Sequence, residues 1–214
     1  MKQITMLSVI LLFGCATHQK TATISSSNNI TTDGKLFTSV FQQRAAEYDA
    51  LCIQAYTIAR VRLDEALNVP TVKPKAIITD IDETILDNSP YAVKRGLQGK
   101  EFEPESWKEW TSLGRADTLV GALDFFKYAA TRNVEIFYIT NRNADEGTGT
   151  ILNLKKFGFP NADDAHLLLR QSVSSKETRR QTISNTHEII LLIGYNYNCT
   201  VRLPNRHNLH WAVQ

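Results

Sequence analysis

Short apolar runs that alternate with helical patterns constrain the fold of this chain more than any other feature of the sequence. The four runs span residues 76–79, 134–139, 166–169 and 189–193. Amphipathic stretches at helical spacing separate them, over residues 120–131, 148–157 and 175–184. Buried strands that alternate with helices predict an α/β fold with a mainly parallel sheet covered on both faces, a Rossmann-like three-layer sandwich.

A long helical pattern precedes the first run. Residues 36–67 are predicted to form one helix, because apolar residues recur at three- and four-residue steps and Pro70 and Pro74 follow. Its expected packing face consists of Phe37, Val40, Phe41, Tyr48, Leu51, Cys52, Ala55, Ala59, Leu63 and Ala66. Residues 89–119 break the later alternation and hold Tyr91, Phe102, Trp107 and Trp110 among charges. We expect that segment to be a small helical cap insertion over the strand ends.

Composition excludes several classes of protein. The 214 residues are 43% hydrophobic and 21% charged, which is typical of a globular domain and not of a disordered or collagen-like chain. The 24 basic and 22 acidic residues nearly balance, so charge gives no case for nucleic-acid binding, and we expect no nucleic-acid partner. Three cysteines are too few for a disulfide scaffold. Cys52 is either a buried thiol or, in an oxidising compartment, a partner for Cys199.

The first residues resemble a secretion signal. Lys2 precedes an apolar run over residues 4–13, which is shorter than the about 20 residues that a membrane-spanning helix needs. The sequence Leu12-Phe13-Gly14-Cys15 resembles a bacterial lipobox, in which cleavage precedes a cysteine that is then acylated. The alternative is a plain signal peptide with an incidental cysteine. We expect a signal peptide over residues 1–14 and a lipid on Cys15.

A polar segment follows the lipobox. Residues 16–34 are rich in Ser, Thr and Asn and cannot bury enough apolar surface to fold. Residues 15–35 are therefore predicted to be the lipidated cysteine and a flexible tether, and residues 36–214 the folded domain. The expected location is the bacterial cell envelope, where the lipid anchor holds the protein to a membrane, with the outer membrane favoured.

Two carboxylates directly follow the first apolar run. Asp80 and Asp82 are two residues apart at the predicted strand end. The first can attack phosphorus and form an aspartyl-phosphate, and the second can protonate the leaving oxygen and later activate water. Both can also hold a hard cation through oxygen. The alternatives are a solvated acidic turn and an acidic helix N-terminus.

Two further polar groups are predicted at the same edge of the sheet. Thr140 follows the second run, and its hydroxyl with the N–H of Asn141 can bind a phosphoryl oxygen, although a helix N-cap is the commoner use of such a threonine. Lys176 opens the third predicted helix, and its ammonium can neutralise a phosphoryl group, unless it is simply solvated. Ligands of such sheets bind at the carboxyl ends of the strands.

The order of these groups resembles the haloacid-dehalogenase-like phosphatases. Residues 73–89 with Tyr91, residues 137–142 and residues 174–177 closely resemble class C bacterial acid phosphatases, the lipoprotein e family. The resemblance extends from about residue 41 to residue 194. It implies a secreted, membrane-anchored acid phosphatase that is 5′-nucleotidase-like, needs a divalent cation, usually Mg²⁺, and hydrolyses nucleoside monophosphates and aryl phosphates through an aspartyl-phosphate.

The resemblance also implies a role for each candidate residue. Asp80 would be the nucleophile and a metal ligand, and Asp82 would be the general acid and base and would give the metal its backbone carbonyl. Thr140 and Lys176 would bind the phosphoryl group. Tyr91, with the tryptophans of the cap, would stack on an aromatic leaving group, although packing in the core is the commoner role of a tryptophan.

The fourth motif of that family departs from its pattern. The family has G-D-N-x-x-D-F after the last strand, and here Tyr195 and Cys199 replace both aspartates. The first of these would be a direct Mg²⁺ ligand, for which neutral tyrosine is a poor substitute. Residues 201–214 show no strand or helix pattern, so we expect a truncated C-terminal part, with a frameshift near codon 195 as one hypothesis. The alternative function is a degenerate, catalytically impaired phosphate-ester-binding lipoprotein or a truncated pseudoenzyme.

Overall fold

The computed structural model describes the backbone of residues 30–196 and 198–202 and the side chains of residues 33–194. The predicted signal peptide, Cys15 and most of the tether lie outside these residues. Within the described part of the chain, no helix combines the length and the apolarity that crossing a membrane requires.

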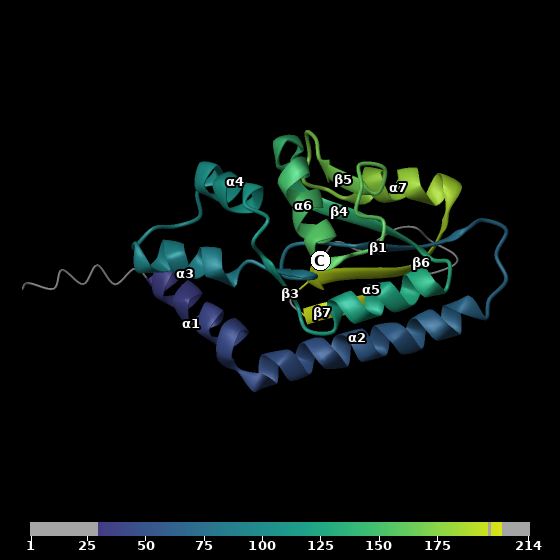
Figure 1. The fold of residues 1–214 in the computed structure, drawn as a ribbon, viewed down its shortest axis with the longest axis horizontal. Helices are drawn as coiled ribbons and strands as arrows, with labels where there is room; N and C mark the ends of the chain where they lie inside the picture. Colours follow the sequence, from purple (N-terminus) through teal and green to yellow (C-terminus); the bar gives the residue numbers. More distant parts are fainter. Residues whose placement is uncertain (1–29, 197, 203–214) are drawn as a thin grey trace, which may run out of the picture.

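The centre of the fold is a five-stranded sheet (Figure 1). Its strands are β1 (Lys75–Thr79), β4 (Glu135–Asn143), β5 (Leu167–Arg170), β6 (Glu188–Asn196) and β7 (Asn198–Arg202). The order is β5-β4-β1-β6-β7; the first four are parallel and β7 pairs antiparallel with β6. All four predicted strands and the mainly parallel sheet are confirmed.

Helices cover both faces of this sheet. The covering helices are α2 (Ala46–Leu67), α5 (Ala122–Thr131), α6 (Gly147–Phe157) and α7 (Glu177–Thr186). The other described helices are α1 (Ile30–Arg44), α3 (Ser89–Leu97), α4 (Pro104–Ser112) and the 3₁₀ turn η1 (Ala144–Glu146). Ile77 of β1 packs in the large cluster that includes Leu63 of α2 and Phe126 of α5. Its neighbour Ile78 packs in a second cluster with Ile183 of α7. Alternate residues of one strand thus contact helices on opposite faces, which confirms the three-layer sandwich.

The single long helix predicted over residues 36–67 is wrong, because the chain bends at Ala45. That residue has extended backbone angles, φ −86° and ψ 121°, between α1 and α2. The bend lets α1 pack on α3 while α2 packs on α5. It also changes the packing face: Cys52, Ala59 and Leu63 are buried as predicted, whereas the exposed residues are Phe37, Val40, Phe41 and Leu51.

The last described strand includes residues for which the sequence predicts no regular structure. Residues 201–214 show no strand or helix pattern, but Val201 and Arg202 belong to β7. The backbone of β7 pairs with β6 from Asn196↔Asn198 to Leu192↔Arg202. Pairing with a neighbouring strand satisfies backbone groups without requiring an apolar pattern in the added strand, so the sequence carries little signal for it.

Helix α1 packs on α3, and both α3 and α4 stand apart from the sheet layers (Figure 1). A short antiparallel ribbon of β2 (Leu86–Asp87) and β3 (Asp117–Thr118) closes the segment that contains them. We call α3, α4 and the loop between them, residues 89–112, the cap. The helical insertion expected over residues 89–119 is present in the fold.

Candidate active site

Asp80 lies directly after β1, beside the neighbouring strand β6. Its N–H donates to the carbonyl of Ile193 at 2.9 Å, which continues the β1–β6 pairing. Its Oδ1 accepts the N–H of Ile81 at 2.8 Å and lies 2.6 Å from Nζ of Lys176. Lys176 is the N-cap residue of α7, so the fold brings a predicted carboxylate and a predicted ammonium into direct contact.

Burial and ion pairing oppose each other in this pair. Burial raises the pKa of Asp80, and the adjacent Lys176 partly offsets that rise. Burial lowers the pKa of Lys176, and Asp80 partly offsets that fall. Two arginines of α7 add positive charge nearby: Arg179 donates to the carbonyl of Thr140, and the charge of Arg180 acts on Asp80. The site is therefore suited to attract an anionic oxygen.

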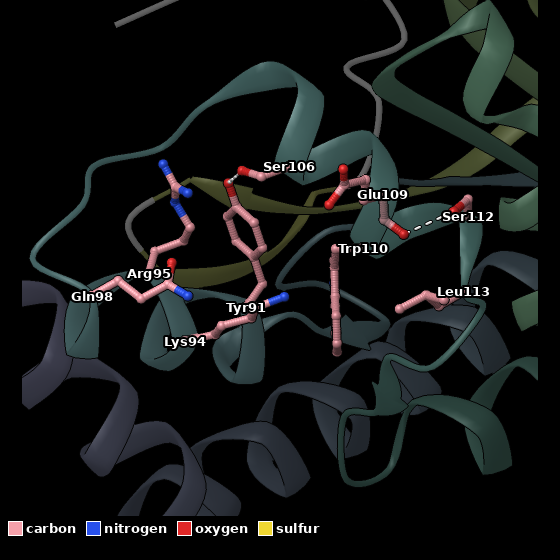
Figure 2. A pocket seen from close by; sticks show the side chains of 9 residues that line it. All are labelled: Tyr91, Lys94, Arg95, Gln98, Ser106, Glu109, Trp110, Ser112 and Leu113. Atoms are coloured by element: carbon pink, nitrogen blue, oxygen red, sulfur yellow. Dashed lines mark hydrogen bonds between the residues drawn. The ribbon is translucent and has the colours of Figure 1, made fainter.

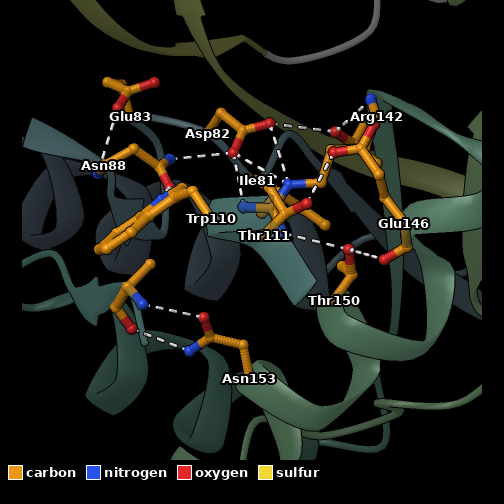
Figure 3. A network of polar contacts seen from close by, with 12 residues as sticks. Ile81, Asp82, Glu83, Asn88, Trp110, Thr111, Arg142, Glu146, Thr150 and Asn153 are labelled. Carbon is orange, nitrogen blue, oxygen red and sulfur yellow. Dashed lines mark hydrogen bonds and ion pairs between the residues drawn. The ribbon is translucent and has the colours of Figure 1, made fainter. Parts of the chain in front are cut away.

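Asp82 is held by donors from two directions (Figure 3). From β4, Nη2 of Arg142 lies 2.7 Å from Oδ1 and the hydroxyl of Thr140 lies 3.3 Å from Oδ2. From the start of α3, Nδ2 of Asn88 donates to Oδ1 at 2.9 Å. The structure thus brings Thr140 to Asp82, while Lys176 contacts Asp80.

Arg142 is the main site residue to which sequence reasoning gave no role. Its side chain is 1% exposed, and its Nη1 donates to the hydroxyl of Thr150 on α6. Strand β4 continues past Ile139 to Asn143; its residues 136–140 and Arg142 are buried, whereas Asn141 and Asn143 are exposed. The two-residue spacing was the available signal, because side chains two apart on a continued strand, such as Thr140 and Arg142, lie on the same side.

The turn that carries Asp82 has an unusual backbone. Glu83 has φ 53°, in the left-handed region of backbone angles that residues other than glycine rarely adopt. Burial, followed by the charge of Asp82, raises the pKa of Glu83 to about 8. The N–H of Asn88 donates to Oε1 of Glu83 at 3.2 Å. The side chains of Glu83 and Asn88 therefore both form hydrogen bonds between this turn and the start of α3.

Tyr91, the remaining predicted substrate-binding residue, lies in the cap. Its hydroxyl is 3.0 Å from Oγ of Ser106, and its ring meets that of Trp107 edge-on at 5.1 Å. Tyr91 and Trp110 line a cavity of about 510 Å³ between α3 and α4 (Figure 2). Its hydroxyl and ring contact other residues of the cap, so Tyr91 lies at this cavity and makes no described contact with Asp80 or Lys176.

A metal ion would find two carboxylates at this strand end. Among the described residues, no group of three or more His, Cys, Asp or Glu side chains is arranged to hold a metal. Mg²⁺ commonly binds through one or two carboxylates, with waters and substrate phosphate completing its shell. Asp80 and Asp82 fit such a shared site and not an all-protein cage. A Cβ on Gly194, which opens the altered fourth motif, would lie 3.9 Å from Cβ of Asp80, and the side chains of Tyr195 and Asn196 are not described.

Solved structures of known phosphatases resemble this fold. A class C acid phosphatase from Bacillus anthracis with tungstate bound is 40% identical, with a TM-score of 0.73 over 75% of this chain and 68% of that chain. A second structure of the class C acid phosphatase from Bacillus anthracis gives 40% identity and a TM-score of 0.72, over 75% and 67% of the two chains.

Two plant proteins are similar to shorter parts of this chain. The stem 31 kDa glycoprotein of Glycine max is 30% identical over 123 residues, which is 55% of this chain and 48% of the relative. Acid phosphatase 1 of Solanum lycopersicum is 30% identical over 96 residues, 44% of this chain and 36% of the relative. The matched regions thus span about half or less of these relatives.

A family model covers most of the chain. The model described as HAD superfamily, subfamily IIIB (acid phosphatase) matches residues 3–199. This match and the likeness to class C enzymes confirm the resemblance seen in the sequence. The chain belongs to the haloacid-dehalogenase-like (HAD) superfamily, subfamily IIIB (acid phosphatase).

Proposed function

We propose that this protein is an acid phosphatase that hydrolyses phosphate monoesters through an aspartyl-phosphate on Asp80. The observation that carries the proposal is the contact of Asp80 with Lys176 at 2.6 Å, next to a turn on which Asp82 is held by several donors. Family membership supports it, as does the 40% identity to a class C acid phosphatase with tungstate bound, since tungstate is a tetrahedral oxyanion like phosphate.

Each residue then has a definite task. A carboxylate oxygen of Asp80 attacks phosphorus, the ester P–O bond breaks, and Asp82 gives its proton to the departing oxygen. Asp82 next removes a proton from water, which attacks phosphorus, releases phosphate and restores Asp80. Lys176 and Thr140 bind the phosphoryl oxygens. A divalent cation held by Asp80 and Asp82, Mg²⁺ in our proposal, would offset the negative charge of the phosphoryl group.

The proposed substrates are nucleoside monophosphates and aryl phosphates. Their leaving groups are aromatic or carry an aromatic base, and Tyr91 and Trp110 offer aromatic surface in the cap cavity. Stacking of the leaving group on these rings would bind it without a specific hydrogen-bond pattern, so we expect broad specificity. We propose further that Cys15 carries a lipid after removal of residues 1–14, which would anchor the enzyme to a bacterial outer membrane.

The second candidate is a phosphate-ester-binding protein without turnover. Tyr195 and Cys199 stand where the family's fourth motif has aspartates, which favours a weakened metal site. The intact pair of Asp80 and Asp82 favours the enzyme. Binding without turnover would still use Lys176 and Thr140, so binding alone does not separate the two candidates.

Phosphate release from the purified chain tests the proposal. An aryl phosphate and a nucleoside monophosphate would be supplied with Mg²⁺ or with a chelator. We expect metal-dependent release that Asp80→Asn abolishes. The matched control is Asp164→Asn, the same chemical change at an exposed carboxylate outside the site, which should keep full activity. A folded chain that binds these substrates and releases no phosphate would support the binding protein instead.

A further inference from the structure

Two hydrogen bonds connect the cap to Asp82 (Figure 3). The indole N–H of Trp110, on α4, donates to Oδ1 of Asn88 at 2.9 Å. The amide nitrogen of the same Asn88 donates to Oδ1 of Asp82, also at 2.9 Å. The cap therefore reaches the turn after β1 through one asparagine side chain.

The chemistry of the three groups fixes the direction of this chain of bonds. An indole nitrogen only donates and a carboxylate only accepts, so the amide of Asn88 must turn its oxygen to Trp110 and its nitrogen to Asp82. Asn88 is 3% exposed, which leaves its amide little access to water as an alternative partner. Loss of the indole N–H would therefore leave a buried carbonyl oxygen unsatisfied and free the amide to rotate.

Asn88 and Arg142 hold the same carboxylate from different parts of the molecule. Arg142 lies on β4 and is itself held by Thr150 of α6, so it belongs to the sheet and its helices. Asn88 is the N-cap residue of α3 and belongs to the entrance of the cap. Without Asn88, Arg142 and Thr140 would set the rotamer of Asp82 from the β4 side alone.

We propose that Trp110 acts through Asn88 as a positioning residue for Asp82, so that the cap sets the orientation of the proton donor. This inference rests on the proposed phosphatase function, because it assigns Asp82 the role of general acid. Neither Trp110 nor Asn88 touches the reacting atoms. Through Asn88, Trp110 affects the step in which a proton reaches the leaving oxygen, separately from any stacking of its ring on the leaving group.

A dependence on the leaving group follows from this role. An alkyl phosphate has a poor leaving group and needs the proton from Asp82, whereas 2,4-dinitrophenyl phosphate departs as a stable anion and does not. Trp110→Phe keeps an aromatic ring in the cap and removes the pyrrole part of the indole together with its N–H. We expect kcat/KM for the alkyl ester to fall about tenfold or more, and for the dinitrophenyl ester less than about twofold, since general acid catalysis contributes about 10²–10⁴.

Two comparisons test whether the effect passes through Asn88. Glu105→Gln changes one exposed side chain of the same helix that does not line the cavity, and should leave both kcat/KM values unchanged. The double variant Trp110→Phe/Asn88→Ala should be no slower than Asn88→Ala alone, because the two changes break one pathway. Equal losses for both esters, or additive losses in the double variant, would overturn the proposal.

Hydrogen exchange of the indole N–H supplies a readout that does not need activity. The chain has three tryptophans, and the signal absent from Trp110→Phe assigns the indole in question. We expect exchange at this indole to speed up about tenfold in Asp82→Ala, because Asn88 loses the acceptor that orients it. An unchanged exchange rate would overturn the proposal that Trp110 is coupled to Asp82 through Asn88. If the native enzyme released no phosphate, the proposed function would fail, and this exchange experiment would still decide whether Trp110 and Asp82 are coupled.

Discussion

The Nζ of Lys176 lies 2.6 Å from Oδ1 of Asp80, although the two residues belong to different layers of the fold. Asp80 follows β1 in the middle of the sheet, and Lys176 precedes α7, which packs on one face through Ile183. The pair therefore forms only when α7 is docked on the sheet. A phosphoryl group bound between the two would meet a nucleophile and a positive charge together.

Replacement of this lysine tests the pair. Lys176→Met should lower kcat/KM by about 10²–10³, the usual loss when one preorganised charge-stabilising group is removed from an active site. Lys176→Arg keeps the charge and should retain part of the activity. Steady-state assays with an aryl phosphate measure both, with circular dichroism to verify folding. Activity of Lys176→Met within twofold of the native enzyme would exclude a role in phosphoryl binding.

The buried pair of Arg142 and Asp82 should matter for stability. Arg142→Ala leaves the Asp82 carboxylate, 23% exposed, without its cationic partner, and should lower the free energy of unfolding by about 3 kcal/mol. Arg62→Ala is the matched control, since its ion pair with Glu65 is about half exposed and should contribute less than about 1 kcal/mol. Urea unfolding measures both, and equal losses would contradict the assignment of Arg142 as a buried, paired charge.

Close packing between α6 and the cap predicts a contrast between two glycines. A Cβ at Gly149 would lie 2.6 Å from the carbonyl oxygen of Thr111, a backbone atom that cannot rotate away. Gly149→Ala should therefore destabilise the protein by about 1–3 kcal/mol. Gly34→Ala on α1 meets nothing within 4 Å and should be neutral or slightly stabilising, because alanine favours helix. Thermal unfolding would contradict this account if the two variants shifted Tm equally.

The thiol of Cys52 should be alkylated slowly in the folded protein. Burial raises its pKa, so the reactive thiolate is scarcer at pH 7–8 than for an exposed cysteine, and its fraction increases as the pH approaches that raised value. In a variant with Cys15 and Cys199 replaced by serine, alkylation at pH 8 should be much slower in buffer than in urea. Equal rates in the two solvents would show that Cys52 is accessible. The side chain of Cys199 is not described, so its pairing with Cys52 stays a hypothesis.

The sequence predicts those parts of the fold whose signal is local. Apolar runs bounded by turns identify β1, β4, β5 and β6, and Asp80 and Asp82 are recognisable because they directly follow such a run. The bend at Ala45 lacks a local signal, since no proline or glycine marks it and the separate docking of α1 and α2 requires it. Strand β7 is likewise defined by its pairing with β6.

The same distinction applies to the candidate site. Thr140, which follows an apolar run, and Lys176, which opens a helical pattern, are predictable from their positions in the sequence. The partners of Asp82 are not predictable, because the strand pattern that includes Arg142 does not indicate which carboxylate its side chain will bind. Asn88 and Trp110 are separated by 22 residues, and only the docking of α4 brings them together. Hydrogen-bond partners that only tertiary packing brings together can be identified from the structure but not from the sequence.

Direct detection of phosphate on Asp80 tests the central claim most closely. The enzyme would be mixed with an aryl phosphate, quenched in acid within the first turnover, and its intact mass measured, with the modified peptide then identified by fragmentation. We predict a mass increase of one phosphoryl group located on Asp80 and absent in Asp80→Asn. Phosphate release without any phosphorylated enzyme, or a phosphoryl group on another residue, would contradict the account.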